Sequence, residues 1–196
     1  MSAALKPVAL ASFAGYSARL QEVLRGADWA PLERLAAELL DCWRTGRHVF
    51  ICGNGGSAGN AIHLANDFLY GISKVAGSGL RVTALPANAS VLTCLANDLG
   101  YETIFSAQLA VLAKKGDVLL AFSGSGNSPN IVKALETAKS TGVKSYAILG
   151  YGGGRAKALA DVAIHFAVDD MQISEDMQLI VGHMLMQWLY ANRPAL

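Results

Sequence analysis

The amino-acid sequence predicts an α/β protein in which a doubly wound, parallel, five-stranded sheet is flanked by helices and preceded by an N-terminal helical arm. The first observation is composition. Of 196 residues, 53% are hydrophobic and the formal net charge is only +1, which suits a chain with a full core. The second is that residues 1–45 show only helical spacing of apolar side chains. The third is that short apolar runs alternate with longer helical stretches after residue 45, an order typical of parallel sheets.

The arm contains two predicted amphipathic helices within a single domain that spans residues 1–196. Their apolar side chains recur at helical spacing in two groups, Phe13, Tyr16, Leu20 and Val23, and then Leu32, Leu35, Leu39 and Trp43. The arm packs either on its own sheet or against another subunit. A mean hydropathy of +0.33 is high for a monomer, so we expect an oligomer.

The α/β core and the C-terminal helix are expected over residues 46–196. Strands are predicted at residues 48–52, 81–85, 118–122, 145–149 and 162–168. Most are separated by enough residues for a crossover helix, so helices should cover both faces of the sheet. Ligands of such sheets bind at the carboxyl ends of the strands. A final helix is expected at about residues 172–191.

Composition excludes several classes of protein. A general nucleic-acid binder would carry a basic surplus, which this chain lacks. No stretch reaches the roughly 18 apolar residues of a membrane-spanning helix, and the N-terminus is a poor signal peptide. Cys42, Cys52 and Cys94 are expected to be buried free thiols of a reducing compartment. A catalytic thiol needs an activating basic neighbour, and Cys52, at a strand end, is the only candidate.

Two loops rich in serine and glycine follow the first and third predicted strands. They read CGNGGSA at residues 52–58 and FSGSGNSP at residues 122–129. Each loop opens a helix, and Ser128 is a natural N-cap with Pro129 at the first helical position. Helix N-termini attract anions, and serine hydroxyls add neutral donors. The pair of loops therefore predicts a phosphate site, although ordinary turns with capping serines are the alternative.

A nucleotide site is the main competitor, and the sequence argues against it. Neither loop completes the G-x-G-x-x-G pattern, and no G-x-x-x-x-G-K-[ST] motif occurs. The second strand ends at Leu85 and Pro86 rather than at an acidic residue that would bind a ribose. A small phosphorylated molecule is the better prediction.

Histidines and carboxylates form two pairs at helical spacing. His63 and Asp67 are four residues apart on the helix after the first serine loop, and Glu175 and His183 lie two turns apart on the last helix. Two imidazoles and two carboxylates suit a divalent metal such as zinc if both pairs converge. The alternative for the first pair is a hydrogen bond on the helix surface.

These motifs resemble those of the SIS (sugar isomerase) domain, and the chain is similar to the phosphoheptose isomerases over nearly its whole length, including residues 97–102 and the helix of His183. The resemblance implies a cytoplasmic homotetramer with sites shared between subunits. It implies that the sugar of the substrate contacts Asn54 and Asp98. It also implies that the substrate phosphate is held by the loop serines Ser57, Ser123, Ser125 and Ser128.

The resemblance further implies a divalent metal, for which zinc is the expected ion. Phosphoheptose isomerases carry His-x-x-x-Glu and a Gln eight residues before a His as metal ligands. The matching residues here are His63, Asp67, Glu175 and His183. Aspartate is one methylene shorter than glutamate, Glu175 adds a negative charge that favours a cation, and an Arg of many relatives is replaced by Gly71.

The resemblance and the acid–histidine set together imply a ketose/aldose isomerase that converts sedoheptulose 7-phosphate to an aldoheptose 7-phosphate through an enediol. Such a reaction requires a general base and a second group that transfers a proton. Asp67 matches the catalytic glutamate of the family, and His183 is the candidate on the opposite side because imidazole titrates near neutral pH. Whether Asp67 acts as base or as ligand stays open.

A non-catalytic SIS protein is the alternative function. Such a protein senses a sugar phosphate or binds a replication-initiator protein. The departures at Asp67, Glu175 and Gly71 motivate this hypothesis. A stoichiometric metal with activity that is lost on chelation would favour the enzyme.

Overall fold

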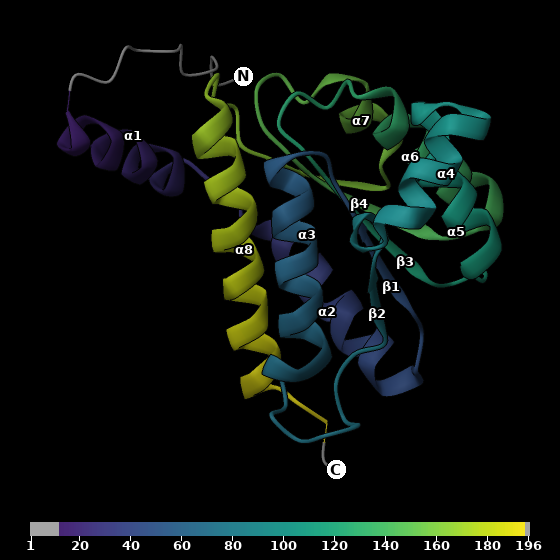
Figure 1. Cartoon of the computed structure of the whole chain (residues 1–196). Helices are drawn as coiled ribbons and strands as arrows, with labels where there is room; N and C mark the ends of the chain where they lie inside the picture. The colour runs from purple at the N-terminus through teal and green to yellow at the C-terminus, as the bar shows by residue number, and fades with distance from the viewer. Residues whose placement is uncertain (1–11, 195–196) are drawn as a thin grey trace.

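The computed structural model describes residues 12–194, and these form a five-stranded, fully parallel sheet between two layers of helices (Figure 1). The strand order is β2-β1-β3-β4-β5. The strands are β1 (Val49–Cys52), β2 (Val82–Ala84), β3 (Val118–Ser123), β4 (Lys144–Leu149) and β5 (Val162–His165). The predicted fold class is confirmed. Each strand falls where the sequence predicts it, although β2 and β5 are both shorter than expected.

The two faces of the sheet are covered by different helices. On one face lie α2 (Ala30–Thr45), α3 (Gly56–Asn66) and α8 (Met171–Ala191), as Figure 1 shows. On the other lie α4 (Ala89–Leu99), α5 (Ser106–Leu112), α6 (Pro129–Thr141) and α7 (Gly154–Leu159). Alternate strand residues point to opposite faces, so Ile51 joins the first core and Phe50 the second. Three short turns, η1 (Asp67–Gly71), η2 (Leu85–Ala87) and η3 (Tyr101–Thr103), complete the elements.

The two helices of the N-terminal arm pack on the core to different extents. Helix α2 packs on its own sheet, and its Leu35 and Leu39 are fully buried. Helix α1 (Phe13–Arg25) buries only Arg19 and Val23, and Phe13 is 98% exposed. Figure 1 shows α1 beside one end of α8 and extending away from the sheet. Tyr16, Leu20 and Leu24 of α1 are partly buried against the same core as α2, so most apolar side chains of both helices are used within the fold and Phe13 is the exception.

The strand order places the two serine loops side by side. From β1 the chain crosses to β2 on one side of the sheet, and β3 pairs with β1 on the other. The order thus reverses between β1 and β3, and ligands of open α/β sheets bind at the carboxyl ends of strands at such a point. The loops that follow β1 and β3 are the two serine–glycine loops.

The cysteines only partly match their predicted environments. Cys42 and Cys52 are buried free thiols, but Cys94 is exposed on α4, so its predicted burial is wrong. Helix α4 leaves every one of its side chains at least partly exposed, which explains the difference. Burial raises the pKa of the Cys52 thiol to about 12, so this thiol is no nucleophile at neutral pH.

Between residues 12 and 194, no helix combines the length and the apolar character needed to cross a bilayer.

Candidate active site

A cavity of about 260 Å³ lies where the two serine loops meet. It is built from the first turns of α3 and α6 and from the start of α8. The four serines predicted to hold phosphate and the predicted sugar contact Asn54 all line it. The full lining is Asn54, Gly55, Ser57, Phe122, Ser123, Gly124, Ser125, Ser128, Met171 and Glu175.

The serine hydroxyls keep their hydrogens available to a ligand. Ser128 occupies the N-cap of α6 before Pro129, as predicted, but its side chain makes no capping hydrogen bond. The hydroxyl oxygens of Ser123 and Ser125 accept hydrogen bonds of 3.0 and 3.2 Å from the N–H groups of Gly126 and Asn127. A hydroxyl that accepts still has an O–H to donate. With the N-termini of two helices at the same cavity, neutral donors and positive partial charges both favour an anion.

A third loop supports the second serine loop from behind. Gly126 has a φ of +69°, and a Cβ built on it would lie 2.0 Å from the carbonyl oxygen of Gly153. The carbonyl oxygen of Gly126 also accepts a 2.9 Å hydrogen bond from the N–H of Ala156, and Asn127 Oδ1 accepts one of 3.0 Å from the N–H of Arg155. Only glycine fits at residue 126, because any side chain would strike this neighbouring backbone.

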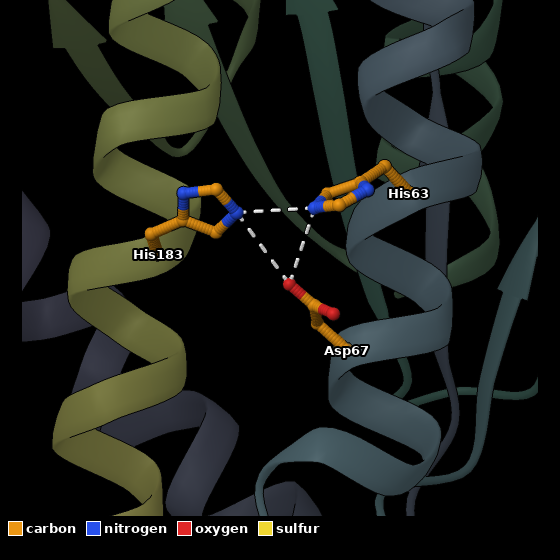
Figure 2. A group of neighbouring side chains, drawn as sticks. All are labelled: His63, Asp67 and His183. Atoms are coloured by element: carbon orange, nitrogen blue, oxygen red, sulfur yellow. Dashed lines mark hydrogen bonds and ion pairs between the residues drawn. The ribbon is translucent and has the colours of Figure 1, made fainter.

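His63, Asp67 and His183 converge from α3, η1 and α8 (Figure 2). The two imidazole Nε2 atoms are 3.0 Å apart, and Asp67 Oδ2 lies 3.4 Å from His63 Nε2 and 3.6 Å from His183 Nε2. Asp67 opens a π-helical turn in which its carbonyl accepts a 3.0 Å hydrogen bond from the N–H of Ile72. Single π-turns at the end of an α-helix occur often at functional sites. The shorter aspartate still reaches both imidazoles.

The donor set of this cluster fits a divalent transition metal. The ligand atoms of a tetrahedral zinc site, each about 2.05 Å from the metal, lie about 3.3 Å from one another. The three atom-to-atom distances in the cluster, 3.0, 3.4 and 3.6 Å, bracket that value. Two nitrogens and one carboxylate oxygen, all partly open to solvent, also leave a fourth position for water or substrate. The residues present thus fit the metal that the sequence predicts.

Glu175 lies away from this cluster and at the serine cavity. A Cβ on Gly56, in the first turn of α3, would come within 2.3 Å of Glu175 Oε2. Helix geometry explains the separation, because eight residues of α8 place Glu175 about 12 Å along the axis from His183. Of the four predicted metal ligands, the structure brings three together and leaves Glu175 beside the serine loops.

Asp98 is the other predicted residue outside the cavity lining. It is exposed on α4, where its carboxylate accepts a 2.7 Å hydrogen bond from Asn97 Nδ2 and lies 3.5 Å from Cys94 Sγ.

Two residues of the site escaped the sequence analysis. Asn130 and Tyr101 both contact the side chain of Asn54, at 2.8 and 3.1 Å. Asn130 is the second residue after the N-cap of α6, a position without a strong side-chain signature, and Tyr101 belongs to η3, far from Asn54 in the sequence. Tyr101 lies in the segment 97–102 that resembles the phosphoheptose isomerases, although no role was predicted for it, and Asn130 is connected with the site only by its tertiary contacts.

Comparisons with known proteins agree with this fold. The sequence profile of the SIS domain matches residues 12–150. A phosphoheptose isomerase of Chlorobaculum parvum is 38% identical over 176 residues, which cover 88% of this chain and 83% of the relative. One of Akkermansia muciniphila is 40% identical over 154 residues, 79% of this chain and 81% of the relative.

A solved structure extends the likeness to three dimensions. The phosphoheptose isomerase of Neisseria gonorrhoeae superposes with a TM-score of 0.83 at 28% identity, over 91% of this chain and 96% of that one. A doubly wound sheet with paired serine loops at its switch point defines the class of sugar isomerase domains. The chain belongs to this SIS domain family and, within it, to the phosphoheptose isomerases.

Proposed function

We propose that this protein is an isomerase that interconverts sedoheptulose 7-phosphate and an aldoheptose 7-phosphate. The observation that carries the proposal is that the serine cavity and the His63–Asp67–His183 cluster share α3 and α8. Ser57 and His63 are six residues apart on α3, which is about 9 Å along the helix axis. An open-chain sugar phosphate is elongated enough to engage both places. The names of the curated relatives support the same reaction.

The phosphate end of the substrate is assigned to the cavity. Ser57, Ser123, Ser125 and Ser128 donate hydroxyl hydrogens there, and the first turns of α3 and α6 add their positive ends. Asn54 contacts the sugar. Asp98, exposed on α4, keeps its expected role as a sugar contact in this proposal.

The reacting end is assigned to the cluster. Isomerisation removes a proton from the carbon next to the carbonyl and returns one to the neighbouring carbon through an enediol. Asp67 has one oxygen, Oδ2, directed at the imidazoles, and its other oxygen lies beside Gly71, where a Cβ would be 3.7 Å away. We assign the proton abstraction to Asp67 through this second oxygen, which separates the role of base from that of ligand. His183 is assigned the proton transfer on the opposite side through Nδ1, because its Nε2 is the atom that faces His63 and Asp67.

The same cluster is the proposed metal site. His63, His183 and Asp67 would hold a divalent cation, zinc by the character of the donors. A cation bound there supplies Lewis-acid polarisation of the substrate carbonyl oxygen. Glu175 completes the set implied by the family, and it would have to leave Gly56 to do so.

We also infer that the chain works as a cytoplasmic homotetramer and as one domain. An apolar groove of about 490 Å³ between α2 and α8 supports self-association. It is lined by Trp29, Leu32, Glu33, Ala36, Met184, Leu185 and Trp188. The three free cysteines support a reducing compartment. The low net charge supports a small-molecule substrate rather than nucleic acid.

The test is a proton NMR assay of the metal-replete protein with sedoheptulose 7-phosphate. We expect an aldoheptose 7-phosphate signal that disappears after chelation and returns with zinc. Absence of aldose from this and related ketose phosphates would contradict the proposal. Thermal stabilisation by the sugar phosphate without turnover would instead favour the sensor, because any ligand that binds only the native state raises its melting temperature.

A further inference from the structure

The side-chain amide of Asn130 is buried and contacts Asn54, which lines the cavity. It is 1% exposed, and it sits in the first turn of α6, next to the loop that holds Ser128. Its amide pairs with that of Asn54 across the two serine loops. Asn54 Nδ2 donates to Asn130 Oδ1 at 2.8 Å, and Asn130 Nδ2 donates to Asn54 Oδ1 at 2.8 Å.

A backbone N–H group fixes which end of each side-chain amide is the oxygen and which is the nitrogen. Asn130 Oδ1 also accepts a 3.0 Å hydrogen bond from the N–H of Ile131, and a backbone N–H can only donate. The same N–H also donates to the carbonyl oxygen of Ser128 at 3.0 Å. A nitrogen of Asn130 in place of Oδ1 would set two N–H groups against each other, so the oxygen faces Ile131 and Nδ2 donates to Asn54. A flipped Asn54 would then place oxygen against oxygen and nitrogen against nitrogen. The orientation of Asn54 thus follows from the fold of α6.

The consequence for the cavity is a defined polarity. Asn54 Oδ1 accepts from Asn130 Nδ2 and from the hydroxyl of Tyr101, at 2.8 and 3.1 Å, so both of its lone pairs are used. Asn54 Nδ2 has one hydrogen bonded to Asn130 and one with no protein acceptor among residues 12–194. Asn54 lines the cavity, and this second N–H is the one group of its amide that is left for a ligand.

We propose that Asn130 is a positioning residue that makes Asn54 present this N–H to an oxygen of the sugar. The inference rests on the proposed function and sharpens it: the ligand atom beside Asn54 is a hydrogen-bond acceptor, a hydroxyl or carbonyl oxygen of the sugar. The serines hold the phosphate independently of this pair. Loss of the amide pair should therefore weaken binding of the sugar and leave binding of phosphate alone.

The test compares Asn130→Asp with Val132→Ala. Asn130→Asp keeps the shape but replaces the donor to Asn54 with an oxygen, so Asn54 is no longer held. We expect the KM for sedoheptulose 7-phosphate to rise about five- to tenfold, the effect of one lost hydrogen bond, with little change in kcat. The Kd of inorganic phosphate, measured by calorimetry, should stay within about twofold. Val132→Ala, a buried control on α6, should lower the melting temperature and leave KM unchanged.

Two further readouts separate positioning from plain destabilisation. The ratio of the KM of Asn130→Asp to that of the wild type should shrink as the pH is lowered, because a protonated carboxyl restores an O–H donor to Asn54. Asn130→Ala, which has no acid, should raise KM without this pH dependence, and it serves if the aspartate variant does not fold. An unchanged KM in either folded variant would overturn the inference.

A failure of the proposed function is distinguishable from a failure of this inference. If the wild type shows no turnover, the isomerase proposal fails, and calorimetric affinity for sedoheptulose 7-phosphate becomes the readout. Equal affinity of the wild type and Asn130→Asp would then overturn the inference, and weaker binding by the variant alone would support it.

Discussion

Asp67 reaches both imidazoles although its side chain is one methylene shorter than the glutamate of the phosphoheptose isomerases. Its Oδ2 lies 3.4 and 3.6 Å from the two Nε2 atoms, and it sits where α3 changes to a π-helical turn. The pairing of residues 63 and 67 on one helix face was predictable from their spacing. Their meeting with His183 could not be derived from spacing, because it depends on how α3 and α8 pack, and only the resemblance to the phosphoheptose isomerases implied it.

The serines were predictable for a different reason. An N-cap followed by proline is a local signal, and Ser128 and Pro129 occupy those positions.

The positions of Glu175 and Asn130 were harder to predict. The spacing of Glu175 and His183 correctly predicted that both lie on the same side of one helix, two turns apart. It did not predict that the Glu175 carboxylate lies against Gly56. Asn130 was missed because its role depends wholly on tertiary hydrogen bonds.

Replacing Glu175 with glutamine should tighten phosphate binding. Its carboxylate lines the cavity proposed for the phosphate, and like charges at close range repel. We expect Glu175→Gln to lower the Kd of inorganic phosphate about three- to tenfold, as for relief of one partly solvated charge contact. Calorimetric titration measures this, and an unchanged or weaker affinity would show that Glu175 does not face the bound anion.

Ser125→Ala should weaken phosphate binding without harming the fold. Its hydroxyl oxygen accepts only from the N–H of Asn127 within its own loop, and the residue is partly exposed. One lost hydrogen bond to a charged ligand corresponds to about ten- to a hundredfold in Kd for inorganic phosphate. The melting temperature without ligand should barely change. Wild-type affinity in this variant would remove the second loop from the site.

His183→Gln should abolish turnover more than binding. Glutamine keeps polarity but can neither transfer a proton near neutral pH nor replace the imidazole in the proposed metal site, so kcat should fall about a hundredfold or more. The Kd of inorganic phosphate should stay close to that of the wild type, because the serine cavity is untouched. A variant that retains most of its kcat would exclude His183 as the proton-transfer residue.

At the scale of the elements, the contact between α3 and α8 holds the site together. Gly182 on α8 packs against Leu64 on α3, and Asn60 Nδ2 donates to the carbonyl of Glu175 at 2.9 Å and to Gln178 Oε1 at 3.2 Å. These contacts hold the helix of His63 in register with the helix of His183. The sequence predicted both helices, with α8 within a residue of its observed start, but it carried no signal for the π-helical turn after α3.

Gly182→Ala should force these helices apart. The new Cβ would lie 2.3 Å from the Leu64 methyl groups, so the substitution should destabilise the fold by about 1–3 kcal/mol and lower activity by disturbing the cluster. Gly59→Ala on α3 is the matched control, because a Cβ there meets nothing within 4 Å. The control should gain roughly 0.5–1 kcal/mol from helix propensity. Denaturant unfolding measures both, and equal stabilities would contradict the packing.

At the scale of the whole molecule, the strand order of the sheet brings the two serine loops together at one edge. The alternation of strands and helices predicted a doubly wound sheet, and ligand binding at the strand ends follows from that class. Composition could not predict which surfaces would bury the apolar side chains of the N-terminal arm. Helix α2 uses its apolar side chains within the fold, whereas Phe13 on α1 stays exposed.

Stability of the whole fold should fall on the acid side of neutrality. Burial lowers the pKa of His48 and His165 below 6.5, with Arg81 and Lys157 adding to the respective shifts. Between the lowered pKa of the folded state and the ordinary pKa of 6.5, the unfolded chain binds more protons than the folded one. The contribution of these two histidines to the free energy of unfolding is therefore fully present above pH 6.5 and is lost as the pH falls towards the folded-state pKa values. Melting curves of the wild type and His48→Gln test this. The variant should show a shallower acid slope, and equal slopes would contradict the assignment for His48.

The most direct test of the account is a crystal structure of the protein with sedoheptulose 7-phosphate bound. We predict that the phosphate lies within hydrogen-bonding distance of Ser57, Ser125 and Ser128. We also predict that the first two carbons of the same sugar lie beside Asp67 and His183. A phosphate bound outside the serine cavity, or a sugar whose reacting carbons lie far from the His63–Asp67–His183 cluster, would contradict the claim that one substrate spans both places.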